Sequence, residues 1–369
     1  MEPYQMTFQK KTICFFNSNK AWGGGEKWHL TTCKEFLRRG HKTFLVTNVR
    51  SELSRKGIQE KLNVFTFYIN NFSFLNPLKI LTLVALFKTE GVEAIVLNLP
   101  SDLKVAGIAA KVAGVKSIIY RRGMPHPLRN TWLNRWLFQK VLTHVVVNSE
   151  EIGRSLKKGN EDWFPAEKMV LVYNGVDSSK PIAHDRKIYE KKDGELVIGN
   201  AGRLTEQKGQ KYLIEMAEIL KRDGVKFRVL IAGDGELKEA LYKMIIDKGL
   251  ENEVKLLGHV DDMTGFFNSL DAFVFTSLYE GSANTLIETL QHGVPTVAWD
   301  VSSNPEIIQH GVTGFLVEGF EVEELVRYTV RLGGEKQIRD EVVDAGYRLV
   351  KEKFESHVNL GKLELLFNK

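Results

Sequence analysis

The sequence has few cysteines, and their placement excludes two classes of protein. Of its 369 residues only Cys14 and Cys33 are cysteines. Two thiols cannot form a disulfide framework, and neither lies in a C-x-x-C or Cys/His spacing typical of a zinc site. The first residues, MEPYQMTFQKK, also lack the basic-then-apolar pattern of a signal peptide. We therefore predict a protein of the reducing cytoplasm.

Long apolar runs are also missing. No stretch reaches the roughly 18 apolar residues that a membrane span needs, and the nearest approach, residues 78–87, contains Lys79 and is followed by Lys88. The hydrophobic content of 43% and the charged content of 26% are ordinary for a soluble globular protein. At 369 residues the chain exceeds what one hydrophobic core usually supports. We predict two domains that do not cross a membrane, with peripheral contact left open.

Acidic residues are scarce in the first half of the chain. Residues 1–180 hold 27 Lys and Arg against 14 Asp and Glu, a net charge of +13, whereas residues 181–369 hold 24 against 32, a net charge of −8. This asymmetry predicts an anionic partner for the first half, either a phospholipid surface, a phosphorylated acceptor or nucleic acid. The alternative is a surface that is basic only for solubility. No RNP-type, zinc-finger or helix-turn-helix pattern supports nucleic acid.

Short β-branched or aromatic runs alternate with helix-period segments along most of the chain, which is typical of parallel βαβ units. Helices are predicted over 26–39, 77–89 and 103–113, each ended by a glycine that takes the left-handed conformation cheaply. The predicted strands are 12–17, 43–47, 64–68, 94–97, 117–120, 145–147, 170–172, 196–201, 227–232, 254–257, 272–276, 296–299 and 315–317.

The alternation lapses once, between residues 178 and 194, in a polar segment without apolar periodicity. We predict an N-terminal domain over 1–178, a linker over 179–194, a C-terminal domain over 195–350 and a C-terminal helix over 351–369 that packs back on the first domain. The predicted fold is α/β, with two doubly wound Rossmann-like domains facing a central cleft. Ligands of such sheets bind beyond the carboxyl ends of the strands.

Glycines and cations follow several strands of the second half. Gly202 and Arg203 end one strand, and Lys208 lies five residues later near a helix start, so both cations could reach an anion. Gly233 follows the next strand, either to admit a ligand or only to form a turn. His259 and Val260 follow a third, where the histidine alone has no assigned role. Neither a GxGxxG fingerprint nor a P-loop occurs.

Two glutamates frame the strongest motif, Glu280-Gly-Ser-Ala-Asn-Thr-Leu-Ile-Glu288. We predict that Ser282 or Asn284 caps a following helix, whose first-turn amides form an anion site. A carboxylate on a partly buried helix face needs a partner, and sugar hydroxyls are suitable ones. A hydrolase is the alternative. Eight residues of helix span about 12 Å, which exceeds the separation of roughly 5–9.5 Å found in paired glycosidase carboxylates.

Together these motifs resemble the retaining family-4 glycosyltransferases of the GT-B fold, including bacterial enzymes of cell-surface polysaccharide or lipopolysaccharide synthesis. The resemblance covers nearly the whole chain, and Glu280 and Glu288 match its E-x7-E motif. The other matching segments are Gly23-Gly24-Gly25-Glu26, Asn174-Gly175-Val176-Asp177, Gly202-Arg203…Lys208-Gly209, Gly233-Asp234-Gly235, Gly258-His259-Val260 and His292-Gly293-Val294-Pro295. Each alone is unspecific, but all of them in this order are specific.

The resemblance implies a hexose-type donor, UDP- or GDP-linked, bound chiefly by the C-terminal domain. Arg203 and Lys208 would bind its diphosphate, Glu288 the ribose and Glu280 the transferred sugar, with Arg203, Lys208 and Glu280 acting in catalysis. The remaining donor contacts implied by the resemblance are Gly24, Gly25, Gly202, Gly233, Val260, Gly281, Ser282, Asn284, Thr285 and Leu286. No Asp-x-Asp run is present for a divalent cation, so no metal or other cofactor is expected.

The resemblance also implies that the N-terminal domain binds a glycan or lipid-linked acceptor. His126 is its candidate for the histidine near the reacting centre, although its context departs from common versions. In the alternative, His126 is only a loop residue, and Arg121 and Arg122 are the residues that bind the acceptor. A retaining reaction would proceed by front-face attack, in which the leaving diphosphate helps to accept the acceptor's proton.

Other activities remain open at this point. A nucleotide-sugar 2-epimerase of the same architecture would bind the donor without an acceptor, and a non-catalytic anion-binding protein could use the basic half. Residues 127–140 read as a helix in which Trp132 and Trp136 share a face near three cations. This pattern predicts either a core stripe or peripheral contact with the anionic inner leaflet of the plasma membrane.

Overall fold

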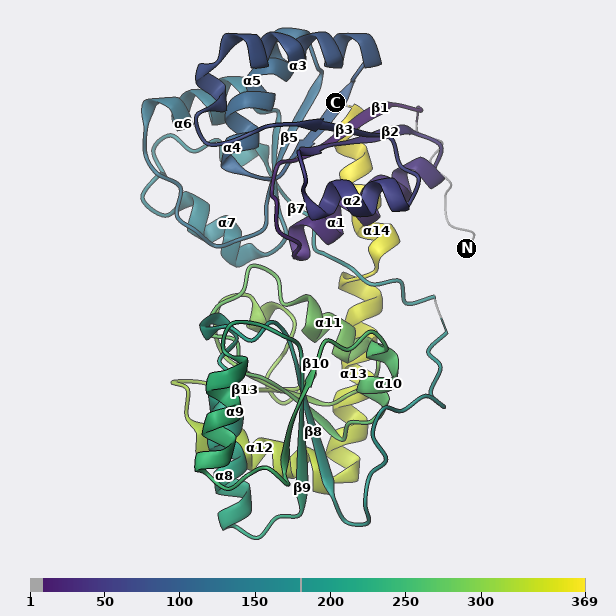
Figure 1. Ribbon diagram of the computed structural model, residues 1–369, viewed down its shortest axis with the longest axis vertical. Coiled ribbons are helices and arrows are strands. Elements are labelled where there is room, and N and C mark those ends of the chain that lie inside the picture. Colours follow the sequence, from purple (N-terminus) through teal and green to yellow (C-terminus); the bar gives the residue numbers. More distant parts are fainter. Residues whose placement is uncertain (1–8, 180, 369) are drawn as a thin grey trace. The chain divides into compact units, whose positions relative to one another are not determined.

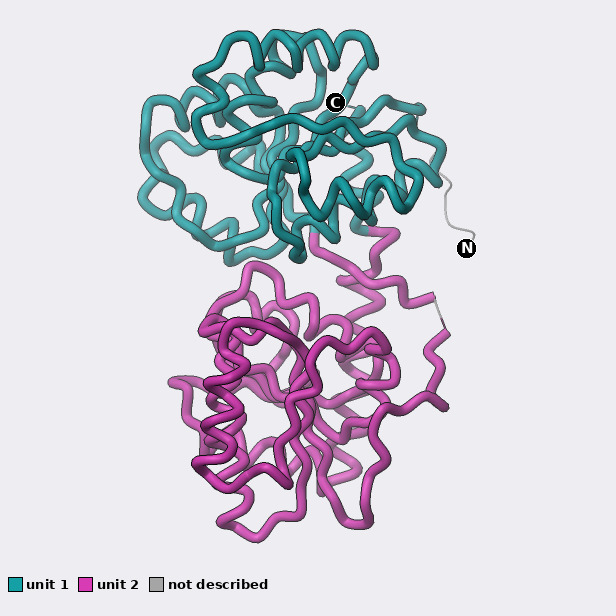
Figure 2. The backbone as a smooth tube through the Cα atoms, viewed as in Figure 1, with its two compact units in different colours: residues 1–172, 359–369 teal, residues 173–358 magenta. Residues whose placement is uncertain are grey.

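The computed structural model describes residues 9–179 and 181–368, so most of the segment examined for a signal peptide lies outside the described residues. The chain forms two compact units (Figure 2). The first comprises the described residues up to Val172 together with the segment from Asn359 onward, and the second runs from Tyr173 to Val358. The domain boundaries given by the sequence stay predictions. Among the described helices, none is long and apolar enough to cross a membrane.

The first unit is built on a seven-stranded sheet in the order β3-β2-β1-β4-β5-β6-β7, with every neighbouring pair parallel. Its strands are β1 (Thr12–Asn17), β2 (Lys42–Asn48), β3 (Val64–Phe67), β4 (Ala94–Leu97), β5 (Ser117–Arg122), β6 (His144–Val147) and β7 (Met169–Leu171). Its helices are α1 (Gly24–Arg38), α2 (Glu52–Gln59), α3 (Pro77–Glu90), α4 (Pro100–Asp102), α5 (Ile108–Ala113), α6 (Trp132–Trp136) and α7 (Glu150–Lys157).

Helices cover both faces of this sheet, which explains why most residues of its strands are apolar rather than alternating with polar ones. Along β1, Cys14 and Phe16 enter one core cluster with helices α3, α5 and α7, whereas Ile13 and Phe15 enter another with α1 and α2. The helices therefore cover both faces of the sheet, as a doubly wound domain requires (Figure 1).

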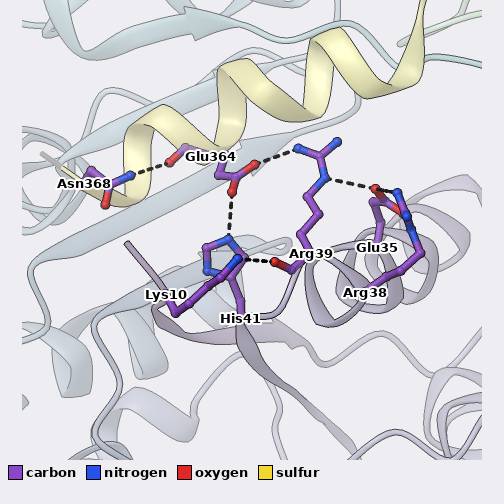
Figure 3. A network of polar contacts seen from close by, with 7 residues as sticks. All are labelled: Lys10, Glu35, Arg38, Arg39, His41, Glu364 and Asn368. Atoms are coloured by element: carbon purple, nitrogen blue, oxygen red, sulfur yellow. Dashed lines mark hydrogen bonds and ion pairs between the residues drawn. The ribbon is translucent and has the colours of Figure 1, made fainter. Parts of the chain in front are cut away.

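The C-terminal segment completes the first unit. Helix α14 (Ser356–Leu365) brings Leu363 into the core cluster that holds β1 and α1, and Leu366 and Phe367 follow it there. Glu364, only 3% exposed, accepts from Arg39 Nη1 at 2.7 Å, and its other oxygen lies 2.8 Å from His41 Nε2 (Figure 3). A buried carboxylate is tolerated because these partners satisfy its charge.

The second unit is built on a six-stranded parallel sheet in the order β10-β9-β8-β11-β12-β13. Its strands are β8 (Leu196–Ala201), β9 (Phe227–Ala232), β10 (Val254–Gly258), β11 (Ala272–Phe275), β12 (Thr296–Trp299) and β13 (Phe315–Val317). Its helices are α8 (Lys211–Arg222), α9 (Lys238–Asp247), α10 (Met263–Asn268), α11 (Asn284–Gln291), α12 (Val322–Gly334) and α13 (Lys336–Lys353). Each strand predicted from the sequence overlaps an observed strand of these two sheets.

Two predicted helices differ from the observed ones. The helix predicted over 127–140 begins only at Trp132, because Thr131 caps it by accepting from the Asn134 amide at 3.2 Å, and a π-helical turn, Leu137–Val141, follows. The helical run that contains residues 103–113 begins earlier, at Pro100 of α4, and passes through a π-helical turn, Leu103–Gly107, before α5. In both cases a proline or a capping residue, Pro100 or Thr131, stands at the observed start.

Candidate functional site

In the second unit, the segments singled out by sequence meet at one edge of the sheet. Strands β10, β9, β8 and β11 are neighbours and run parallel, so their carboxyl ends lie along the same edge (Figure 1). Gly202 comes directly after β8, Gly233 after β9, Val260 two residues after β10 and Thr276 after β11. This is the edge at which ligands bind in open α/β sheets.

The loops that follow β8, β9 and β10 come so close together that position 233 can hold only a glycine. Gly233 has φ +137°, and a Cβ added there would lie 1.9 Å from the Gly202 carbonyl oxygen. Its amide donates to the Gly258 carbonyl at 2.7 Å. Gly233 is therefore required by backbone contact between the loops after β8, β9 and β10, whether or not a ligand also approaches it.

Lys208 is held against the end of β11 by its own backbone. It closes a 3₁₀ turn, Glu206–Lys208, and its carbonyl accepts from Thr276 Oγ1 at 2.9 Å. Gly209 follows at φ +60°, where a Cβ would lie 2.3 Å from the Thr276 carbonyl oxygen. The stem of Lys208 is thus fixed beside Gly202 and β11 before any ligand binds.

The side chains of Lys208 and Glu280 form an ion pair. Lys208 Nζ lies 2.5 Å from Glu280 Oε1, and the two side chains are only 17% and 9% exposed. The ammonium also lies 5.6 Å from the centre of the Phe275 ring. Glu280 precedes α11 rather than lying on it, so the helical spacing used against a hydrolase does not apply. Instead Glu280 pairs with a cation, Lys208, and no sequence motif had predicted this pairing.

Arg203 is an exposed cation at the same edge. Within residues 9–179 and 181–368 its guanidinium makes no hydrogen bond and no ion pair. Its backbone is fixed, because Gln210 Nε2 donates to the Arg203 carbonyl at 3.0 Å. A guanidinium whose backbone is held while its five N–H donors face solvent suits an anionic ligand.

The start of α11 differs from the sequence expectation. Its N-cap is Ala283, and neither Ser282 nor Asn284 caps it. Instead Asn284 Oδ1 accepts from Asn174 Nδ2 at 2.8 Å and from Ser282 Oγ at 3.2 Å. The side-chain oxygen that would have capped the helix is used to attach this turn to the Asn174-Gly175 segment, so the cap prediction is wrong.

The remaining motif residues of the second unit occupy varied environments. Gly281 and Leu286 are buried, whereas Thr285 and Glu288 on α11 and Val260 after β10 are half-buried. The Leu286 amide donates to the Ala283 carbonyl at 2.9 Å, and the Asn284 amide to the Ser282 carbonyl at 2.9 Å. These two amides are engaged within the turn, so donor contact by them stays a prediction.

Side chains that could coordinate a metal ion are dispersed. Among the described residues, no group of three or more His, Cys, Asp and Glu could hold a metal ion. Asp261 lies 3.2 Å from His259 Nε2 with both side chains exposed, and Asp262 caps α10 by accepting from the Gly265 amide at 3.0 Å. The adjacent aspartates thus have separate local partners.

In the first unit, Gly24 and Gly25 form the first turn of α1. A Cβ on Gly25 would lie 3.2 Å from Asn98 Nδ2, beyond the end of β4. The next residue, Glu26, is 3% exposed and accepts from Asn17 Nδ2 at 3.2 Å and Asn19 Nδ2 at 3.0 Å. The glycine-rich turn is therefore anchored at the carboxyl ends of β1 and β4.

The two arginines at the end of β5 have different surroundings. Arg121 is 2% exposed and lies over the Trp28 ring at 4.2 Å, and burial lowers its pKa to about 10 against the opposing charge of Glu26. Arg122 donates to the Tyr120 hydroxyl at 3.1 Å and to the His126 carbonyl at 2.8 Å. This geometry favours Arg121 as a support for α1 and Arg122 as a support for the following loop.

The His126 side chain is exposed in that loop, and its imidazole makes no hydrogen bond within the part of the chain that the structure describes. The structure brings Arg122 to the His126 backbone rather than to its ring. The roles of Arg121, Arg122 and His126 toward an acceptor stay predictions. Trp132 and Trp136 on α6 are 78% and 39% exposed, which excludes the core alternative for Trp132.

Two buried titratable residues of the first unit were not predicted as site residues from the sequence. His29, fully buried on α1, has its pKa lowered to about 3 by burial and by the charge of Arg121. Asp102, fully buried after β4, has its pKa raised to about 7 by burial, although it accepts from the Leu99 amide at 2.9 Å and the Ser18 amide at 3.3 Å. A signal for Asp102 existed, because Ser101-Asp102 follows an apolar strand end.

Comparison with known proteins matches both units to families. The model described as "Glycosyltransferase Family 4" matches residues 22–180, and that described as "Glycosyl transferases group 1" matches residues 181–348. A capsular polysaccharide biosynthesis glycosyltransferase of Staphylococcus aureus is 28% identical over 53% of this chain and 53% of its own length. An amylovoran biosynthesis glycosyltransferase of Erwinia amylovora is 32% identical over 53% of this chain and 49% of its own. The chain thus spans about half the length of these two relatives.

A longer match is the Escherichia coli UDP-Gal:alpha-D-GlcNAc-diphosphoundecaprenol alpha-1,3-galactosyltransferase, 25% identical over 76% of this chain and 78% of its own. Among solved structures, Anabaena HepE in complex with UDP and glucose superposes with a TM-score of 0.79 at 20% identity, covering 97% of this chain and 99% of HepE. A Rickettsia africae glycosyltransferase gives 0.85 at 18% identity, covering 98% of each chain. These likenesses confirm the predicted two-domain α/β fold, GT-B.

Proposed function

This chain belongs to glycosyltransferase family 4, and on that premise we propose that it moves a hexose-type sugar from a nucleotide-diphosphate sugar to a glycan or lipid-linked acceptor, with retention of anomeric configuration. The observation that carries the proposal is the Lys208–Glu280 ion pair at the sheet edge where Arg203 presents its guanidinium to solvent. A UDP-linked donor is favoured by HepE, a structural neighbour solved with UDP and with UDP-glucose.

Arg203 and Lys208 would bind the donor diphosphate. An ammonium has three N–H donors, and Lys208 uses one on Glu280, so two remain for phosphate oxygens. Arg203 adds a planar fork that suits a phosphate. Because the Lys208 backbone is already fixed by Thr276, little ordering is left to occur when the donor binds.

Glu280 and Glu288 would contact the two ends of the donor. Glu280 would accept hydroxyls of the transferred sugar while keeping its bond to Lys208, which places the sugar directly beside the diphosphate. Glu288, four residues into α11, would accept the ribose hydroxyls. Val260 and Gly233 would approach the nucleotide. The rest of the donor site would be lined by Gly202, Gly281, Ser282, Asn284, Thr285 and Leu286.

In the reaction, the bond from the anomeric carbon to the diphosphate oxygen breaks, and the acceptor oxygen forms a new bond on the same face. The acceptor's proton passes to the leaving phosphate oxygen. Negative charge therefore grows on the diphosphate, where Arg203 and Lys208 stabilise it more in the transition state than in the ground state. This accounts for catalysis without a protein nucleophile or a metal ion.

The acceptor is proposed to belong to a cell-surface glycan. This rests on relatives named for capsular polysaccharide in S. aureus and for lipopolysaccharide core in Rhizobium meliloti. In this chain Gly24 and Gly25 would approach the donor or acceptor from the first unit, and Arg122 and His126 would contribute to the acceptor site. A cytoplasmic enzyme acting beside the inner leaflet fits a lipid-linked acceptor.

The test is a panel of UDP- and GDP-sugars scored by thermal shift, followed by assay of the best donor. We expect one donor to raise the melting temperature, and release of nucleotide diphosphate that depends on added acceptor. Conversion of the donor sugar without an acceptor would indicate an epimerase instead. Donor binding without turnover across glycan and lipid-linked acceptors would favour a non-catalytic binding protein.

A further inference from the structure

We propose that the first unit binds the surface of an anionic lipid bilayer through an apolar strip on helix α3 and the turn before it. The strip consists of Phe72, Leu75, Leu78 and Leu81. Their side chains are 73%, 67%, 72% and 60% exposed. This inference goes beyond sugar transfer, because binding to a membrane can be measured without substrate.

Helix α3 is apolar on both of its faces. Its inner face places Leu83, Val84 and Phe87 in the core cluster shared with α5. Its outer face carries Leu78 and Leu81, three residues apart and therefore neighbours on the helix surface. A helix that is apolar all round is normally covered on all sides. Here the outer side is open, and contiguous exposed apolar patches of this kind mark interaction sites.

The turn before the helix extends the strip. Residues 73–75 form a 3₁₀ turn, and Asn76 caps α3 by accepting from the amides of Leu78 and Lys79. This cap fixes Phe72 and Leu75 close to the first turn of the helix. Phe74 packs inward against the core, where Lys104 Nζ lies 5.4 Å from its ring centre. The exposed residues thus sit on an ordered scaffold.

Charge around the strip has one sign. Between Glu60 and Glu90 the sequence has no Asp or Glu and three lysines. Lys79 Nζ donates to the Tyr68 carbonyl at 2.8 Å and lies 5.1 Å from the centre of its ring, and Lys20 Nζ lies 5.7 Å from the same ring. Tyr68 is itself 58% exposed. Apolar side chains beside an aromatic ring and ammonium groups suit the interface of an anionic leaflet.

Complementarity of charge favours the bilayer over a second copy of the chain. A symmetric dimer through this strip would face the same lysines across the axis, because such an interface uses one patch twice. An anionic leaflet instead supplies the opposite charge to a half of the chain that carries +13. The sequence had placed the membrane contact at Trp132 and Trp136 instead. Helix α6, which carries both, spans only Trp132–Trp136, and Trp136, at 39%, is less exposed than any residue of the strip.

The experiment measures co-sedimentation of the full chain with vesicles of phosphatidylcholine alone or with about a third phosphatidylglycerol, at low and high salt. We expect binding to the anionic vesicles at low salt, and weaker binding at high salt. Leu78→Ser with Leu81→Ser should weaken that binding at least about tenfold, because each buried apolar side chain contributes substantially. Both residues are exposed, so thermal melting should show an unchanged fold.

Matched controls remove the same features elsewhere. Ile58→Ser with Val312→Ser deletes two apolar side chains that are 62% and 52% exposed outside the strip, and should leave vesicle binding unchanged. Lys88→Glu, at an exposed lysine of α3, should reduce binding, whereas Lys243→Glu on α9 of the second unit should not.

Three outcomes would overturn the proposal. One is that the wild-type chain fails to bind anionic vesicles at low salt. Another is that the Leu78/Leu81 variant binds them as well as the wild type. The third is that sedimentation velocity without lipid shows a dimer that the same double variant converts to a monomer, since the occupant of the strip would then be a second copy. The Leu78/Leu81 variant is also tested for nucleotide-sugar binding. This measurement distinguishes failure of the membrane proposal from failure of the proposed transferase function.

Discussion

At the scale of single residues, the two cations of the second unit should contribute equally to turnover and differently to stability. Arg203→Ala and Lys208→Ala should each lower turnover at least about 10²-fold, because each removes a group that acts on leaving-group charge. Only Lys208→Ala should also lower the melting temperature, since it leaves the buried carboxylate of Glu280 without its cation. Steady-state turnover and thermal melting measure the two effects.

Lys211→Ala is the matched control for this pair, because Lys211 is an exposed cation three residues beyond Lys208 with its ammonium 5.0 Å from the Tyr212 ring. It should keep near wild-type turnover. Near-normal turnover in a correctly folded Arg203→Ala/Lys208→Ala variant would contradict the assignment of both residues to the diphosphate.

The two glutamates should separate by ligand. Glu288→Gln should weaken binding of UDP alone, because it loses an acceptor for the ribose hydroxyls. Glu280→Gln should leave UDP binding intact and weaken binding of the full UDP-sugar, because only the sugar reaches it. Titration calorimetry of both variants with UDP and with the donor found in the panel measures this. Equal loss of UDP affinity in both would show that the division is wrong.

The buried pair His29 and Asp102 should nearly cancel each other's effect on stability. The folded pKa of Asp102 is about 7 against an ordinary 3.8, so its contribution to the free energy of unfolding is lost as pH rises between those values. The folded pKa of His29 is about 3 against an ordinary 6.5, so its contribution is lost as pH falls through that range. Between about pH 4 and 6.5 the two slopes oppose each other.

Asp102→Asn should therefore make stability depend on pH. Relative to the wild type, the free energy of unfolding of the variant should rise by up to about 1.4 kcal/mol per pH unit between pH 4 and 6.5. Urea denaturation at pH 4.5, 5.5 and 6.5 measures this slope. Parallel pH profiles for the variant and the wild type would show that Asp102 is not protonated in the folded protein in this range.

At the scale of elements, the turns after β8 and β9 should tolerate no side chain where they touch. Gly233→Ala should destabilise the protein by at least about 3 kcal/mol and abolish nucleotide binding, because φ is +137° and the new Cβ would meet the Gly202 carbonyl. Gly224→Ala is the control: φ is +71° with nothing within 4 Å, so about 1 kcal/mol is expected. Denaturant melts and nucleotide titration compare them, and equal costs would refute the close contact.

Strands were more predictable than helix starts. The strands of both sheets are short, mostly apolar runs bounded by turn residues, and their shortness and β-branched content distinguish them from buried helices. The start of α6 depends instead on one hydroxyl, because Thr131 caps the helix and excludes the five residues before Trp132. At the start of α11, the side chain of Asn284 does not cap the helix but accepts from Asn174, which lies 110 residues earlier in the chain.

The sequence motifs supplied the candidate site residues but not the contacts between them. Lys208 and Glu280 are 72 residues apart, and only the adjacency of β8 and β11 brings them together. Arg121 was a candidate for binding the acceptor, but β5 lies between β4 and β6 in the sheet, and Arg121 is only 2% exposed and lies over Trp28. Long-range pairing of this kind leaves no local periodicity to detect.

At the scale of the whole molecule, turnover should not require a divalent metal ion. The sequence contains no Asp-x-Asp run, and in the proposed donor site Arg203 and Lys208 would supply the positive charge that such an ion provides. Activity should therefore persist in excess EDTA. Assay before and after chelation, with Mg²⁺ or Mn²⁺ added back, measures this; complete loss in EDTA that either ion restores would contradict it.

The chain leaves the first unit at Val172 and re-enters it at Asn359, so that unit is discontinuous in sequence. During synthesis the ribosome must deliver all of the second unit before Leu363, Leu366 and Phe367 can fill the remaining space against α1. A fragment ending at Val172 would therefore emerge with an open core and with Arg39 and His41 deprived of Glu364. Chimeras that exchange the first unit between relatives would need to carry this last segment together with the rest of that unit.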